Sequence, residues 1–280
     1  MDIFKAYERH LVLNRKSPST IYQYLTDIKL FCKAVDPFVC TVHHIESFFE
    51  SLIKKGYENS SLQRKLAAIK SFFHFLLDEE EISKLPFVNL PKFKVAYKEQ
   101  RILTLDEVGS IFAVLSGLPM TLKTKELDCI FRIFYFLGLR VAEAVSLDIR
   151  NVRADDISFT GKGNKTRILP LVNPGLTTSL SEWVEFRKRF YGEALFINTT
   201  VKDRISVRTV QRWIKELGEM AEIEGCISPH MMRRTFATHL LDKGADIFSV
   251  SDLLGHSSLS TTKRYARVSV KKRKETLLLL

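Results

Sequence analysis

Residues 228–265 read SPHMMRRTFATHLLDKGADIFSVSDLLGHSSLSTTKRY and predict a series of short helices. Ser228 followed by Pro229 is typical of a helix N-terminus, because the serine side chain caps free amide groups and proline needs no hydrogen bond in the first turn. Asp246 can cap a second helix, which ends at Gly255. The turns between these helices bring the polar residues of the stretch towards one place.

Four side chains in this stretch can take part in chemistry. His230 and Arg233 are three residues apart and therefore share a helical face. His256 is expected just beyond the second helix, and Tyr265 on a predicted third helix that Ser260 can cap. Guanidinium groups bind phosphate oxygens, imidazoles carry protons, and an activated phenol is a nucleophile. This combination favours phosphate chemistry.

The chain is basic, with a formal net charge of +11 over 280 residues. Residues 1–95 contain 14 basic and 11 acidic side chains, and residues 96–280 contain 29 and 21. This excess indicates a polyanionic partner, and nucleic acid is the commonest polyanion that basic proteins bind.

No stretch of the sequence predicts export or a membrane span. The apolar runs are too short to cross a bilayer, and the N-terminus, MDIFKAYERHL, lacks the apolar core of a signal peptide. We therefore expect a cytoplasmic protein that does not bind membranes. The cysteines lack the spacing of metal ligands and are expected to be free thiols, mainly in the core: Cys32, Cys40, Cys129 and Cys226.

Residues 1–85 are expected to form a compact module of four helices. Ser17 and Pro18 mark the start of the second helix. The fourth helix is predicted from apolar residues at helical spacing, which are Leu62, Leu66, Ile69, Phe73 and Leu76. Its other faces carry the basic residues Arg64, Lys65 and Lys70. Two interpretations of these charges are open, solvated surface groups or contacts to a DNA backbone.

A basic linker is predicted over residues 86–101, because two prolines and several lysines stand there without helical periodicity. Residues 102–280 are then expected to form a second domain. It begins with a helix whose capping box is made by Thr104 and Glu107.

The apolar segment ELDCIFRIFYFLG, residues 126–138, predicts a buried central helix that ends near Gly138. Arg140 and Glu143 follow in hydrophobic surroundings, where a charge is costly unless it is paired or used. Either the two residues pair and close the helix junction, or Arg140 serves a functional site.

The segment DDISFTGKGNKTRILPL, residues 155–171, predicts a β-hairpin with Lys162 in its turn. The turn lacks the spacing of a nucleotide-binding P-loop, and an ordinary flexible hairpin is the alternative. A later helix, near residues 206–222, carries Arg208 and Arg212 at helical spacing, and both are candidate DNA contacts.

Four segments resemble the catalytic motifs of the tyrosine recombinases, the phage integrase family, and among them the Xer-type enzymes most. They are FLGLRVAEAVSL, TGKGNKTRILPL, SPHMMRRTFATHLLDKGAD and LLGHSSLSTTKRYARVS. The resemblance covers about residues 102–270 strongly and the N-terminal module more loosely, as a core-binding domain. Several motifs in the same order are far more specific than any one alone.

The resemblance assigns roles to individual residues. The catalytic positions of the family are filled by Arg140, Lys162, His230, Arg233, His256 and the nucleophile Tyr265, with Glu143 as the acidic residue that supports the first arginine. Arg234 stands where the family usually has histidine, at a position that is not catalytic. The implied reaction cuts and rejoins DNA through a 3′-phosphotyrosyl bond and needs no metal, cofactor or ATP.

The resemblance also implies a fold and partners. The fold is mainly α with a small β-hairpin or sheet, in which a helical core-binding domain and an α+β catalytic domain form a C-shaped clamp on DNA. The partners are double-stranded DNA with a short near-palindromic site and three further copies in a DNA-bound tetramer, with or without a second recombinase. The C-terminal segment, which ends in four leucines, is expected to dock into a neighbouring protomer.

Several alternatives remain open. Resolution of chromosome or plasmid dimers is the favoured task, and integration or excision of a mobile element is the other. A type IB topoisomerase shares the same residue types, and a DNA-binding protein without catalysis is a different class. A zinc site could use Cys226, His230, His239 and His256, although their spacing is poor for it.

Overall fold

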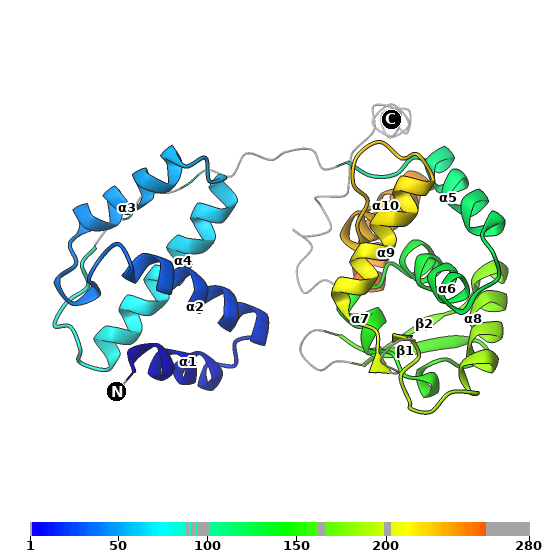
Figure 1. The fold of residues 1–280 in the computed structure, drawn as a ribbon, viewed down its shortest axis with the longest axis horizontal. Coiled ribbons are helices and arrows are strands. Elements are labelled where there is room, and N and C mark those ends of the chain that lie inside the picture. The colour runs from blue at the N-terminus through cyan, green and yellow to red at the C-terminus, as the bar shows by residue number, and fades with distance from the viewer. Residues whose placement is uncertain are drawn as a thin grey trace, which may run out of the picture. The chain divides into compact units, whose positions relative to one another are not determined.

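The computed structural model describes residues 2–87, 90, 93, 101–161, 166–198 and 203–255. The chain divides into two compact units, residues 1–99 and 100–280, called here the N-terminal and C-terminal units (Figure 1). Three residues of the predicted catalytic set, Lys162, His256 and Tyr265, lie outside the described residues, as does the C-terminal segment.

The N-terminal unit is helical, as the sequence predicts. Its elements are α1 (Ile3–Leu13), α2 (Pro18–Cys32), the 3₁₀ turn η1 (Pro37–Val39), α3 (Val42–Lys54) and α4 (Asn59–Asp78). The predicted cap is confirmed, because the Ser17 side chain accepts a hydrogen bond from the amide of Thr20 and Pro18 opens α2. The turn η1 carries too few residues to show a periodicity and was not expected from the sequence.

Phenylalanine rings form much of the core of the N-terminal unit. Every member of the predicted stripe on α4 is buried, and α4 packs against α1 and α2. Phe87 is also buried, and Leu90 and Phe93 pack against the same core, with the ring of Phe93 4.9 Å from that of Phe49. Part of the predicted linker segment therefore packs against the N-terminal unit.

Lys65 corrects one expectation. The sequence places it on an outer face of the fourth helix, but it is 5% exposed and its Nζ lies 2.6 Å from Oδ1 of the buried Asp27 on α2. Its ammonium also lies over the ring of Tyr57, 5.3 Å from the centroid. A buried carboxylate needs a cation nearby, and Lys65 is held inward to provide it. Lys65 is therefore a structural ion-pair partner between α2 and α4.

The C-terminal unit combines seven helices with short antiparallel strand pairs in its described residues. Its helices are α5 (Leu105–Gly117), α6 (Leu122–Leu137), α7 (Val141–Ser146), η2 (Ile149–Asn151), α8 (Pro174–Arg187), α9 (Val207–Met220), α10 (Pro229–Asp242) and α11 (Ile247–Leu254), where η2 is a 3₁₀ turn. Its strands are β1 (Asp156–Thr160), β2 (Thr166–Pro170), β3 (Ile197–Asn198) and β4 (Asp203–Arg204). β1 pairs with β2 and β3 with β4, and in the first pair Thr160 stands opposite Thr166. The mainly helical fold with a predicted hairpin is confirmed.

Helix α6 is the central element of the C-terminal unit and packs against α8, α9 and α10 (Figure 1). It ends where the sequence predicts, at Gly138, which has a positive φ of 61°. A Cβ atom there would lie 2.3 Å from the ring of Phe236 on α10, so only glycine allows this close approach. The turn at Gly138 places Arg140 directly at the N-terminus of α7.

No helix within the described residues is long and apolar enough to cross a bilayer. The four cysteines are free, as expected from their spacing. Cys129 is buried, whereas Cys226 is exposed and is not part of the core.

Candidate active site

Arg140, Glu143 and Arg233, called here the arginine cluster, come together from α7 and α10. Nη1 of Arg140 donates to Oε1 of Glu143 at 2.7 Å, and the backbone amide of Arg140 donates to Oε2 at 2.7 Å. Nη1 of Arg233 lies 3.8 Å from the same Oε2. One carboxylate therefore orients two guanidinium groups that are 93 positions apart in the sequence, Arg140 and Arg233.

The two guanidinium groups differ in burial. The Arg233 side chain is 4% exposed, and its Nη1 donates to the carbonyl of Gly138 at 2.5 Å. The Arg140 side chain is 35% exposed, whereas that of Glu143 is 6% exposed. An incoming anion can therefore reach Arg140 from solvent, while the buried Glu143 and Arg233 fix its position from the protein interior. Both open interpretations of Arg140 are compatible with this arrangement, since the pair forms and one member stays accessible.

The C-terminal end of α11 is the second component of the site. Its last carbonyl groups lack partners within the helix, as in any α-helix. Arg140 donates to the carbonyl of Gly255 at 3.5 Å, and Arg233 donates to that of Leu254. Arg167 on β2 donates to the carbonyls of Asp252, at 3.0 Å, and Leu253. Three arginines from three different elements thus bind four consecutive carbonyls.

Arg167 was not singled out from the sequence. Its guanidinium stacks over the ring of Phe159 on β1, with 5.2 Å between the guanidinium carbon and the ring centroid. Partial burial lowers its pKa, and the charges of Glu143 and Arg140 also act on it, the first raising and the second lowering the pKa. A strand position gives no sign of these contacts, because their acceptors lie 85 and 86 positions further along the chain.

His230 stands in the first turn of α10, directly after the Ser228 and Pro229 start that the sequence predicts. His230 is exposed at the surface, yet desolvation by the surrounding residues lowers its pKa. Three positive charges lower the pKa further, those of Arg234, Arg233 and Arg140. The lowered pKa favours the neutral imidazole, and the charges that act on His230 include both guanidinium groups of the arginine cluster.

The other predicted catalytic residues, Lys162, His256 and Tyr265, lie outside the described residues, so only their sequence neighbours can be named. Lys162 belongs to the connection between β1, which ends at Thr160, and β2, which begins at Thr166. His256 directly follows Gly255, whose carbonyl accepts from Arg140. The structure thus brings Arg140, Glu143, His230 and Arg233 together and leaves Lys162, His256 and Tyr265 as predictions.

The candidate DNA contacts lie on separate helices. On α4, Lys70 is exposed and Arg64 is partly exposed, with its Nη1 3.0 Å from Oδ2 of Asp27. On α9, Arg208 is exposed, and Arg212 is 66% exposed with its Nε 3.5 Å from Oε1 of Glu216. Apart from Lys65, these residues stand where a phosphate backbone could reach them.

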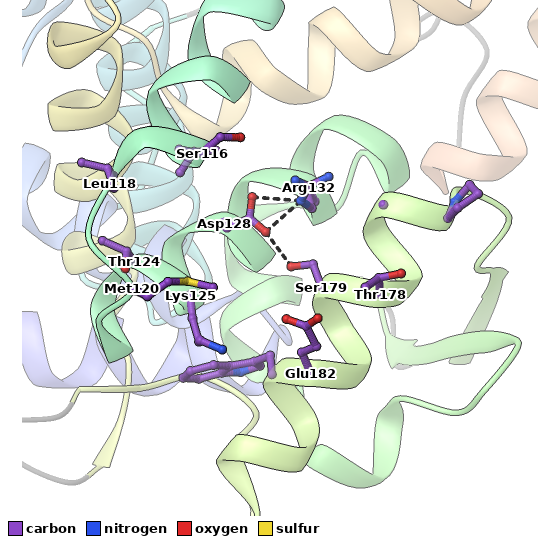
Figure 2. A pocket seen from close by; sticks show the side chains of 14 residues that line it. Ser116, Leu118, Met120, Thr124, Lys125, Asp128, Arg132, Thr178, Ser179 and Glu182 are labelled. Atoms are coloured by element: carbon purple, nitrogen blue, oxygen red, sulfur yellow. Dashed lines mark hydrogen bonds and ion pairs between the residues drawn. The ribbon is translucent and has the colours of Figure 1, made fainter.

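A cavity of about 500 Å³ opens between α5, α6 and α8 (Figure 2). In it Arg132 donates to Asp128 at 2.9 and 2.8 Å, and the hydroxyl of Ser179 donates to Asp128 at 2.6 Å. Met120 and Trp183 supply apolar lining. No residue of the arginine cluster lines this cavity.

The residues of the zinc alternative are not assembled in the part of the chain that the structure describes. Both ring nitrogens of His239 have partners, the carbonyl of Leu103 at 2.9 Å and the hydroxyl of Tyr135 at 3.3 Å. Within the described ranges no group of three or more histidine, cysteine or acidic residues is arranged to hold a metal ion.

Comparison with known proteins identifies the family. Residues 101–272 match the phage integrase family, and residues 4–80 match the phage integrase N-terminal SAM-like domain. The chain belongs to the phage integrase family. The activity of this family is site-specific DNA recombination, so the chain is a tyrosine site-specific recombinase, as its motifs predict.

Individual relatives agree with this assignment over nearly the whole chain. Tyrosine recombinase XerC of Shewanella sp. (strain ANA-3) is 32% identical over 268 residues, which are 92% of this chain and 88% of the relative. Tyrosine recombinase XerA of Thermococcus onnurineus is 34% identical over 274 residues, 96% of this chain and 92% of the relative. A crystal structure of XerH bound to its palindromic difH substrate shares the fold, with a TM-score of 0.74, 22% identity and coverage of 92% of this chain and 78% of that one.

Proposed function

We propose that this recombinase cleaves a DNA phosphodiester by attack of Tyr265, within a site built around the arginine cluster. The observation that carries the proposal is the convergence of Arg140 and Arg233 on Glu143. The charges of both arginines also act on His230. A phosphodiester resists attack because it is anionic and its alkoxide is a poor leaving group. Two guanidinium groups held in one place address the first of these difficulties.

The arginines stabilise the charge that builds on the two non-bridging oxygens during attack. Arg140 is accessible and can meet the phosphate first, while Arg233 is fixed by the Gly138 carbonyl and by Glu143. A preorganised donor of this kind is worth about 10²–10³-fold in rate when it points at developing charge. Glu143 contributes by fixing the direction of both guanidinium groups and does not itself touch the substrate.

The remaining roles follow from the chemistry of each residue type. The phenolic oxygen of Tyr265 forms a bond to phosphorus as the bond from phosphorus to the 5′-oxygen breaks, and Lys162 supplies the proton to that oxygen. His230 and His256 accept the phenolic proton or donate hydrogen bonds to the phosphate. The 3′-phosphotyrosyl product keeps the ester energy, so a 5′-hydroxyl of a second strand can reverse the reaction and rejoin DNA without ATP.

The number of strand cleavages in recombination sets the number of protein copies that act together. Each chain has one Tyr265, and exchange between two duplexes requires four strand cleavages, so four copies act together on DNA. The XerH relative was crystallised with a palindromic substrate, which supports a short near-palindromic site for this chain as well. Arg64, Lys70, Arg208 and Arg212 are proposed to contact the DNA backbone, and the leucine-rich C-terminal segment is proposed to dock into the next protomer.

The proposed biological task is resolution of chromosome or plasmid dimers in the cytoplasm. The relatives named Xer over nearly the full chain length support it. Integration or excision of a mobile element is the second candidate, and a partner recombinase is compatible with either task.

The test is covalent capture on the DNA of the source organism. Protein is denatured after reaction, and the DNA that stays attached is sequenced. The wild type is compared with Tyr265→Phe and with Tyr191→Phe, a control at a fully exposed tyrosine of the same unit. One short near-palindromic locus, lost only in Tyr265→Phe, is the expected result. Adducts scattered over the genome would point to a topoisomerase, and adducts that survive in Tyr265→Phe would refute the assigned nucleophile.

A further inference from the structure

The C-terminal turn of α11 has a local cap at Gly255, whose backbone amide donates to the carbonyl of Asp252 at 2.8 Å. Side chains from elsewhere in the unit donate to the carbonyl groups of the same turn, which in any α-helix lack partners within the helix. Here the carbonyls of Asp252 and Leu253 accept from Arg167, and those of Leu254 and Gly255 accept from Arg233 and Arg140. The negative end of the helix dipole strengthens such contacts with cations.

Arg167 differs from the other two arginines that bind the end of α11. Among the described residues it forms no hydrogen bond or ion pair with Glu143. It extends from β2 to the carbonyls of α11, and its guanidinium stacks on the ring of Phe159. Gly255 leaves the space for it, because a Cβ atom there would lie 2.5 Å from Nη1 of Arg167. The position of Arg167 is therefore fixed by a stacked ring, two carbonyls and a glycine.

The end of α11 couples Arg167 to the arginine cluster. Arg233 and Arg140 donate to the two carbonyls that follow those bound by Arg167, within one turn of the helix. A shift of this turn would move the acceptors of both guanidinium groups at once. The placement of Arg140 and Arg233 is thus tied to the contact that Arg167 makes.

We infer that Arg167 is a positioning residue, which sets the two arginines of the active site by fixing the C-terminal turn of α11 against the hairpin. The inference rests on the proposed function, because it assigns the effect to arginines that bind the scissile phosphate. Arg167 itself does not touch the substrate. Its guanidinium is directed at the protein backbone through two carbonyls and is covered on one face by Phe159.

The test uses the full chain and a duplex that carries the site found by covalent capture. Arg167→Lys keeps the charge but loses the planar fork that binds two carbonyls. Arg189→Lys is the control, since Arg189 stacks on Phe186 at 5.4 Å in the same way but forms no hydrogen bond or ion pair with α11 among the described residues. Each variant is measured on the natural phosphodiester and on a duplex whose scissile phosphate is replaced by a methylphosphonate. The methylphosphonate is neutral, so stabilisation by the arginines contributes less to its cleavage.

Arg167→Lys is expected to slow formation of the covalent complex on the phosphodiester by about 10- to 100-fold. Displacing a catalytic group by about 1 Å can cost about 10²-fold in rate, and a smaller displacement costs less. DNA affinity is expected to stay within about threefold, because no phosphate contact is removed. On the methylphosphonate the same variant should be slowed less than about threefold, since the misplaced charges matter little there. Arg189→Lys should match the wild type on both substrates.

Gly255→Ala provides a second variant, in which residue 167 is still arginine. The added methyl group displaces the guanidinium, so the same difference between the two substrates is expected. Equal slowing of Arg167→Lys on both substrates would overturn the inference, because a general loss of folded structure does not distinguish them, and so would an unchanged rate on the phosphodiester. Failure of the wild type itself to form a covalent complex would refute the proposed function, and the inference with it.

Discussion

Arg187 and Arg233 are both buried in the C-terminal unit, at 1% and 3% exposure, yet their surroundings differ. Arg187 donates to carbonyls three to seven positions away, those of Phe190, Tyr191, Gly192 and Ala194. Arg233 donates to the carbonyls of Gly138 and Leu254, which are 95 and 21 positions away. Arg187 therefore stabilises the loop that directly follows it in the chain. Arg233 connects elements that are distant in the sequence, and such a connection can assemble a functional site.

The carboxylates beside the two arginines differ in the same way. Glu126, which interacts electrostatically with Arg187, is 0% exposed, and its Oε2 has no hydrogen-bond partner in the described structure. Glu143 uses both oxygens on Arg140 and also lies near Arg233. The first centre is closed to substrate, whereas the second reaches solvent through Arg140. This contrast predicts that the same substitution has different effects at the two arginines.

Arg233→Lys is expected to show the largest effect on catalysis. The rate of covalent complex formation should fall by about 10²–10³-fold, roughly 3–4 kcal/mol, because a lysine cannot hold Glu143 and the phosphate in the planar geometry of a guanidinium. Single-turnover cleavage of the captured site measures it. An effect below about fivefold would mean that Arg233 is only a structural residue like Arg187.

Arg187→Lys is expected to affect stability and to leave the chemistry unchanged. A lysine cannot reach all the carbonyls that Arg187 binds, and buried acceptors left without donors cost about 1–3 kcal/mol each. We expect a loss of roughly 3 kcal/mol of unfolding free energy in denaturant titrations. The cleavage rate per folded molecule should stay within about twofold of the wild type, and slowing as large as in Arg233→Lys would remove the distinction between the two arginines.

Glu126→Gln is expected to change how stability depends on pH. Burial raises the pKa of Glu126 to about 8, against the opposing effects of the Ile197 amide and Arg187. The folded state therefore keeps a proton that the unfolded state loses, and stability falls as pH rises from the ordinary value of 4.5 to about 8. This group contributes at most about 1.4 kcal/mol of loss per pH unit, and Glu126→Gln should remove that part. Calorimetric melting from pH 5 to 9 measures it, and identical slopes in both proteins would contradict the assignment.

Arg234→Gln is expected to cause the smallest change, a shift in the pH profile of cleavage. Burial lowers the pKa of His230 and the charge of Arg234 lowers it further, so the neutral form persists to lower pH than in an ordinary histidine. Removing the charge raises that pKa, and the acidic limb of the rate profile should move to higher pH. Arg150→Gln is the control, because Arg150 is an exposed arginine that pairs with Asp148 instead. A profile that moves equally in both variants would point to a general charge effect.

The parts of the fold that follow from neighbouring residues could be predicted. The Ser228 cap, the Thr104 capping box and the end of α6 at Gly138 can each be recognised from residues within four positions, and the structure confirms all three. The pair β3 and β4 was not foreseen, because strands of two residues carry no periodicity.

Contacts across the sequence could not be predicted from composition or spacing. Lys65 has the same local pattern as an exposed lysine, and its burial depends on its ion pair with Asp27, 38 positions away. The contacts of Arg167 with α11 depend on how β2 lies against that helix. The arginine cluster could be anticipated through resemblance to a family, whereas the shared carbonyls that join Arg140, Arg167 and Arg233 required the structure.

The central claim is that the arginine cluster activates a phosphate for attack by one tyrosine. Mass spectrometry of the covalent complex, after digestion of its protein and DNA, tests this most directly. We predict a single modified peptide that contains Tyr265, linked to the 3′-phosphate of a nucleotide. A nucleotide on a different residue, or one joined through a 5′-phosphate, would contradict the account.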